Sequence, residues 1–125
     1  MIVPTLSKQS ASLVDDFGVA EDRHDDLDGY TVSFVTIRES HDLAPMLAAL
    51  PGGKCTCPHW GYVFKGRLTI RYGDHEETVE AGEAFFMSPG HAPAAEAGTE
   101  LVQFSPADQM RATTDAIKKA AAQNA

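Results

Sequence analysis

The sequence predicts an all-β protein, a single small barrel of short strands with an α-helix at its C-terminus. Between Tyr30 and Phe104, runs rich in β-branched and aromatic residues recur, with Gly- or Pro-containing turns between them. After Ser105 the apolar residues change from a strand-like period to a helical one. The 125 residues are enough for one domain with a single core.

The chain divides into three segments. Residues 1–29 are polar and acidic, and we expect a loosely packed N-terminal arm that carries a short strand or two. Residues 30–104 form the predicted barrel. Residues 105–125 form the predicted helix, which begins in a capping-box-like sequence with Pro106 at the first helical position. A thin apolar stripe that includes Met110 and Ile117 would place this helix on the outside of the sheet.

Within the barrel segment, the first strand is predicted over residues 30–38. A short helical turn capped by Asp42 should follow and end at Pro51-Gly52-Gly53. In residues 67–72 polar and apolar side chains alternate, which is typical of a strand with one wet and one packed face. The remaining strands are predicted over residues 62–64, 68–72, 77–80, 84–87 and 100–104.

Charge argues against two classes of partner. The 18 acidic and 10 basic residues give a net charge of −8, which gains nothing from the counterion release that drives nucleic-acid binding. Anionic membrane surfaces would repel the same charge.

No run approaches the roughly 20 apolar residues of a membrane-spanning helix. The N-terminus lacks a basic start followed by an apolar run, so we expect a cytoplasmic protein.

Metal-ligating residue types gather in one short segment. Cys55, Cys57 and His59 occupy alternate positions, so in an extended strand all three would project from one face. His91 follows a Ser-Pro-Gly turn further along the chain. A disulfide between cysteines this close in sequence would be strained. In a reducing compartment they are more plausibly free thiols or ligands.

Two stretches resemble the motifs of the cupin family of small β-barrels. Residues 59–66 have the spacing of the Glu-to-Gly half of the first motif, with His59 where the family has Glu. Cys55-x-Cys57 resembles the preceding His-x-His pair. Residues 82–91 resemble the second motif, with Gly90 at the family's Gly and His91 two residues before the usual His. The resemblance implies a cupin-like barrel of jelly-roll type that pairs into a homodimer.

The four residues Cys55, Cys57, His59 and His91 are therefore the predicted metal ligands. Two thiolates and two imidazoles suit tetrahedral zinc, with iron as the alternative metal. None of the family's usual ligands is kept at its usual position, so its iron or manganese oxygenase activities do not transfer. Four bound ligands would make a closed, structural site. If one cysteine turns away, three ligands and an open position remain.

Three functions stay open. The first is a zinc cupin whose lumen holds a small molecule, with Lewis-acid chemistry such as isomerisation, hydrolysis or lyase activity. The second is a non-catalytic binding or sensing protein. The third is a metal-free structural or interaction domain, in which the cysteines are small buried apolar residues. A thiolate nucleophile paired with His59 is a further hypothesis. The sequence assigns no catalytic residue.

Other residues receive simpler interpretations. His24, His41 and His75 lie in acidic or polar surroundings and are predicted to be surface residues. Trp60, Tyr62 and Phe64 have the opposite strand parity from His59. They would therefore point out of the barrel, where the N-terminal segment or a second subunit would cover them.

Overall fold

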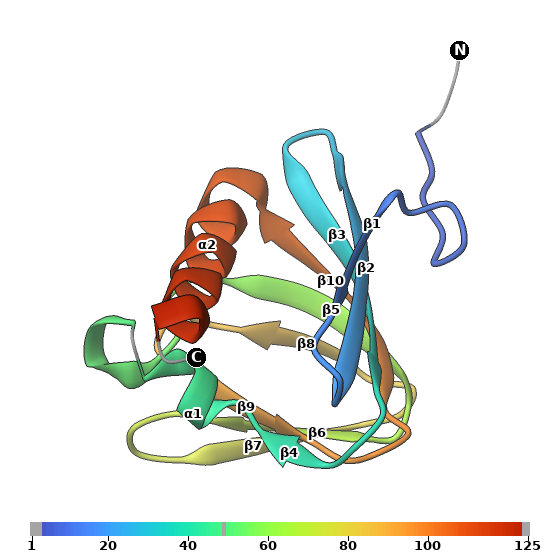
Figure 1. Cartoon of the computed structure of the whole chain (residues 1–125). Helices are drawn as coiled ribbons and strands as arrows, with labels where there is room; N and C mark the ends of the chain where they lie inside the picture. The colour runs from blue at the N-terminus through green and yellow to red at the C-terminus, as the bar shows by residue number, and fades with distance from the viewer. Residues whose placement is uncertain (1–3, 49, 124–125) are drawn as a thin grey trace.

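Two antiparallel sheets make up most of the protein (Figure 1). The computed structural model describes residues 4–48 and 50–123, so residues 1–3 of the predicted arm and 124–125 of the predicted helix lie outside the described residues. One sheet has the strand order β1-β2-β3-β10-β5-β8. Its strands are β1 (Leu13–Asp16), β2 (Ala20–Leu27), β3 (Tyr30–Ile37), β10 (Glu100–Pro106), β5 (His59–Lys65) and β8 (Ala84–Met87).

The second sheet has the order β4-β9-β6-β7. Its strands are β4 (His41–Asp42), β9 (Ala92–Ala95), β6 (Arg67–Arg71) and β7 (Glu76–Glu80). The helical elements are α1 (Ala44–Leu47), a 3₁₀ turn (Pro51–Gly53) and α2 (Ala107–Gln123). In the described residues, no helix combines the length and the apolar character that a membrane crossing needs.

The all-β prediction with a C-terminal helix is confirmed, and the architecture is a jelly roll. The expected closure of the sheet is corrected, because the strand ladders of the described residues fall into two sheets rather than one continuous barrel. The two sheets share one core. Inward-facing residues of both pack into a single cluster, which includes Val63, Phe85 and Leu101 from the first sheet and Leu68 and Ile70 from the second.

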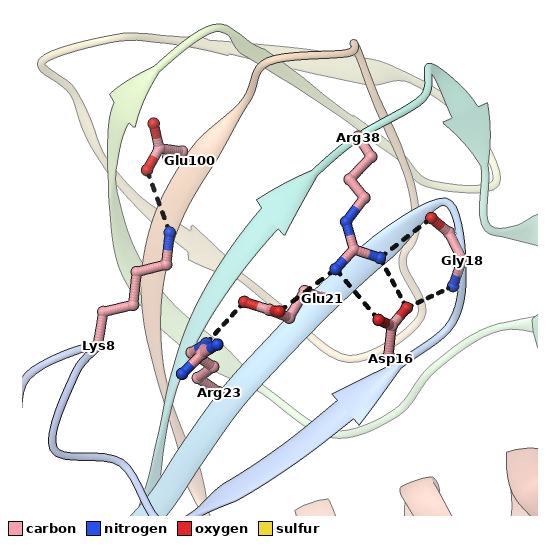
Figure 2. A network of polar contacts seen from close by, with 7 residues as sticks. All are labelled: Lys8, Asp16, Gly18, Glu21, Arg23, Arg38 and Glu100. Carbon is pink, nitrogen blue, oxygen red and sulfur yellow. Dashed lines mark hydrogen bonds and ion pairs between the residues drawn. The ribbon is translucent and has the colours of Figure 1, made fainter.

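Residues 13–27, within the predicted arm, form two strands of the larger sheet. β2 is paired with β3 along all eight of its residues, from Ala20↔Ile37 to Leu27↔Tyr30. Its sequence holds mostly charged residues, which have low strand propensity. Arg38 ties this end of the sheet together: its guanidinium donates to Asp16 at 2.6 and 3.1 Å and to Glu21 at 3.3 Å (Figure 2). Pairing and this charge network therefore hold a strand that composition alone does not favour.

The helices close one side of the molecule (Figure 1). The N-cap residue of α1 is Leu43, which makes no side-chain capping hydrogen bond, and not the predicted Asp42. The Asp42 carboxylate does accept a hydrogen bond from the backbone N–H of Ala44 at 2.8 Å. β10 continues through Pro106, so α2 begins at Ala107, two residues after the predicted boundary. α2 packs against β10, β3 and α1. Ion pairs from Arg111 to Asp26 (2.5 Å) and from Lys118 to Asp15 (2.8 Å) join it to the N-terminal strands.

Candidate metal centre

Three of the four predicted ligands meet inside the protein. Ligand atoms of Cys55, His59 and His91 all lie within 4.8 Å of one another. All three residues are buried, with exposures of 4, 6 and 1%. An isolated antiparallel bridge joins Cys55 to His91, and β5 begins at His59. Backbone pairing thus brings together two residues that are 36 positions apart in the chain.

Hydrogen bonds orient both imidazoles. The His91 Nδ1 lies 2.7 Å from the Ser88 carbonyl oxygen, which can only accept, so Nδ1 carries the proton and Nε2 keeps its lone pair. That Nε2 is buried and has no hydrogen-bond partner. The His59 Nδ1 lies 2.6 Å from the Ser105 hydroxyl, and its Nε2 lies 3.8 Å from the Cys55 Sγ. Holding Nδ1 in this way is how proteins present Nε2 to a metal.

Cys57 is not brought into the group formed by the other three ligands. The chain bends at Cys57 and Pro58 precedes β5, so the alternation that would align Cys57 with His59 does not apply. Its sulfur lies 3.7 Å from the Pro58 carbonyl oxygen. The residue is only 1% exposed and packs in a cluster with Leu47 and Ala92. Burial raises the pKa of its thiol to about 12, so it stays protonated at neutral pH.

Burial keeps all of these groups neutral. It raises the pKa of the Cys55 thiol and lowers the pKa of His91. It also lowers the pKa of His59 to about 3, and the nearby charge of protonated His91 would add to the effect. A thiolate–imidazolium pair between Cys55 and His59 is therefore disfavoured, which argues against the nucleophile hypothesis. Neutral imidazoles are the form that binds metals.

The three residues open onto a cavity of about 420 Å³. Both sheets, α1 and α2 contribute to its walls, which are mostly apolar. Cys55, His59 and His91 line it, and Cys57 is not among the lining residues. A volume of this size is typical of sites for small organic molecules. The arrangement therefore combines three metal-ligating atoms with an adjoining space for a ligand.

Sequence reasoning missed two residues of this region. Ser105 was assigned to the start of the helix, yet it lies in β10, is fully buried and contacts His59. It shares strand parity with Leu101 and Gln103, which line the cavity, and this parity is the signal that could have found it. The surface prediction is wrong for His24, which lines the cavity with a side chain only 19% exposed. His75 is on the surface, as predicted, with 51% exposure.

Comparisons with known proteins find solved structures of similar fold, but no match among family models or curated proteins. No protein-family model matches the chain, and no curated protein matches it. A solved structure of a protein of unknown function from Rhizobium leguminosarum has a TM-score of 0.62 at 18% identity, covering 84% of this chain and 97% of that one. An RmlC-like cupin from Shewanella frigidimarina has a TM-score of 0.55 at 15% identity, covering 83% and 92%.

The structure titled FeII HppE has a TM-score of 0.57 at 11% identity and covers 82% of this chain and 60% of that one. At these identities the likeness concerns the fold alone. The two-sheet jelly roll, its C-terminal helix and these neighbours define the protein as one with the cupin fold. The cluster of Cys55, His59 and His91 is a possible metal site within that fold.

Proposed function

We propose that the protein binds one zinc ion through Cys55, His59 and His91, and that the adjoining cavity holds a small organic molecule. One observation carries the proposal: the Nε2 of His91 is buried without a partner, in a group whose ligand atoms lie within 4.8 Å of one another. A buried nitrogen lone pair without a partner is costly, and a metal ion would satisfy it.

The chemistry of the donors fits zinc. One thiolate and two imidazoles are borderline-soft ligands that zinc accepts readily, whereas magnesium and manganese prefer oxygen. Because Cys57 lies outside the group, the site has three protein ligands, the number found in catalytic rather than structural zinc sites. Iron remains the alternative metal, since a neighbour in fold carries FeII in its title.

A zinc ion held there would supply Lewis acidity toward an oxygen-bearing ligand in the cavity. The protein's own contribution is positional. Ser105 and Ser88 hold the two imidazoles in place. This arrangement supports Lewis-acid catalysis of isomerisation, hydrolysis or lyase type. Non-catalytic binding or sensing of a small molecule is the second candidate, because no cavity residue has been identified as a general acid or base.

Metal content provides the first test. Protein purified without added metal should contain close to one equivalent of zinc per chain, measured by inductively coupled plasma mass spectrometry. After removal of metal with a chelator, zinc should rebind in competition with a chromogenic chelator. Absence of metal from the purified protein, together with failure to rebind zinc or ferrous iron, would support the metal-free alternative instead.

Cobalt substitution provides the second test. A three-ligand site with an open position should show thiolate-to-cobalt charge transfer, and azide or thiocyanate should shift its visible bands. A spectrum that does not respond to these anions would indicate a closed site. Zinc-dependent hydrolysis of 4-nitrophenyl acetate would then favour an enzyme, whereas anion binding without turnover would favour recognition.

We propose further that the protein forms a homodimer through an aromatic face on the outside of the larger sheet. This face comprises Tyr30, Trp60, Tyr62, Phe64, Phe86 and Phe104, each 40–50% exposed. Such side chains would present roughly 500 Å² of aromatic surface, a large share of the ~800 Å² that each partner buries in a standard interface.

Two free buried cysteines are compatible with a reducing compartment, which supports a cytoplasmic location.

The dimer is tested by sedimentation of Trp60→Glu. Trp60 contacts Phe86 and Tyr30, at ring-centroid distances of 5.0 and 6.4 Å, and so lies within the aromatic face. A charge there should convert a dimer into a monomer without loss of bound zinc. Glu39→Gln, which changes an exposed residue outside the face, serves as the control. A wild-type protein that sediments as a monomer would contradict the proposal.

A further inference from the structure

The cavity has a second polar region on β2 and β3, in the same sheet as β5 with its His59. Asp22, His24 and Ser33 line it from β2 and β3. Each carries a buried polar atom without a hydrogen-bond partner: the Asp22 Oδ1, the His24 Nδ1 and the Ser33 Oγ. Ser33 is 0% exposed. Its buried hydroxyl, which has no hydrogen-bond partner among the described residues, distinguishes this region from a simple group of acidic residues.

Strand register fixes where this region lies. His24 on β2 pairs with Ser33 on β3, Ser33 pairs with Gln103 on β10, and Gln103 pairs with Gly61 on β5. Ser33 is therefore two strands away from β5, which carries His59. Two strand spacings amount to about 10 Å. One elongated molecule could reach both regions through the apolar middle of the cavity.

The charges around the cavity favour a cation. Five aspartates line it (Asp15, Asp22, Asp25, Asp26 and Asp115), against one arginine and one lysine. Arg111 is paired with Asp26 and Lys118 with Asp15. Among the described residues, the ion pair recorded for Asp22 is with His24: Asp22 Oδ1 and His24 Nδ1 lie 3.4 Å apart without the geometry of a hydrogen bond, so the carboxylate is left without a charged partner when His24 is neutral. A partly buried carboxylate oxygen that accepts no hydrogen bond would interact most strongly with a charged N–H donor.

We propose that Asp22, His24 and Ser33 form a subsite for the ammonium group of a small organic amine. The amine's other end would point along the cavity toward Cys55, His59 and His91. This second part, but not the ammonium subsite itself, rests on the proposed metal function. The ligand class is then an elongated primary amine of about 10 Å that carries an oxygen donor at its far end.

Calorimetric titration with hexylamine tests the subsite without involving the metal. Metal-free and zinc-loaded protein should bind hexylamine alike, and hexanol and hexanoate should bind at least about tenfold more weakly, because neither supplies the charged donor. Asp22→Asn should weaken hexylamine binding about tenfold. Glu39→Gln, which removes the same charge from an exposed position, should leave it unchanged.

Ser33→Ala separates recognition from folding. Because the buried hydroxyl has no partner, its removal should leave the melting temperature unchanged or raise it, while hexylamine binding weakens several-fold. Equal binding of hexanol and hexylamine, or no effect of Asp22→Asn, would overturn the subsite. 6-Aminohexanoate tests the orientation: it should bind more tightly to zinc-loaded than to metal-free protein. If the protein binds no zinc, hexylamine binding should persist, so the two proposals fail separately.

Discussion

Replacement of the two cysteines by serine separates the structure's three-ligand site from the four-ligand set that the sequence suggests. Cys55 belongs to the group with His59 and His91, and Cys57 does not. Four-ligand zinc sites bind with about 10–16 kcal/mol, or about 2.5–4 kcal/mol for each ligand. Since 1.4 kcal/mol corresponds to a factor of ten, Cys55→Ser should weaken zinc binding about 60- to 700-fold.

Cys57→Ser is the matched control, because it makes the same change two residues away at an equally buried position. The cluster around Cys57 is apolar, so a hydroxyl there should destabilise the metal-free protein by about 1–3 kcal/mol. Zinc affinity should stay within a factor of about three. Cys55 belongs to the same apolar cluster as Cys57, so Cys55→Ser should destabilise the metal-free protein by a similar amount.

Two measurements on each variant are needed, zinc affinity by chelator competition and the free energy of unfolding of the metal-free protein in urea. The two variants should differ in zinc affinity and not in stability: Cys55→Ser loses zinc binding and Cys57→Ser keeps it, while the free energy of unfolding falls by a similar amount in both. Equal losses of zinc affinity would refute the three-ligand geometry and restore Cys57 as a ligand. Unchanged affinity in Cys55→Ser would remove the thiolate from the site.

Three further predictions concern single residues. Ser105→Ala removes the hydrogen bond that orients His59 and should weaken zinc binding about 10- to 100-fold, measured by the same competition assay. Gly66→Ala should destabilise the protein by about 2 kcal/mol or more in urea unfolding, because Gly66 has φ +81° and an added Cβ would clash with its neighbours. The Asp22 carboxylate, whose Oδ1 lies 3.4 Å from the His24 Nδ1, raises the pKa of His24, so this pair stabilises the fold below pH about 6.5 and the contribution is lost as pH rises through the raised pKa. His24→Gln should therefore reduce stability at pH 6 more than at pH 9, and a pH-independent effect would contradict this assignment.

Strand propensity and turns predicted most of the fold. One strand that they missed, β9, and one that was expected in the N-terminal arm without bounds, β2, share a physical reason. β9 reads Ala-Pro-Ala-Ala and has no β-branched or aromatic residue, yet it pairs with β6 from Leu68↔Ala95 to Arg71↔Ala92. β2 is largely charged. Both strands are held by their partners in a ladder, and single-sequence propensity carries no information about such long-range pairing. Closure of the sheet depends on the same long-range pairing and was equally out of reach.

Three of the four residues named as ligands come together in the structure, but not by the mechanism that predicted it. Alternation along a strand was expected to align Cys55, Cys57 and His59, but β5 starts only at His59. Cys55 reaches the site by another route, its backbone bridge to His91, with N···O distances of 2.9 and 3.2 Å. This bridge places a thiol beside an imidazole whether or not residues 56–58 are extended. The geometry of the centre therefore depends on the pairing of two distant loops, which neither motif contains by itself.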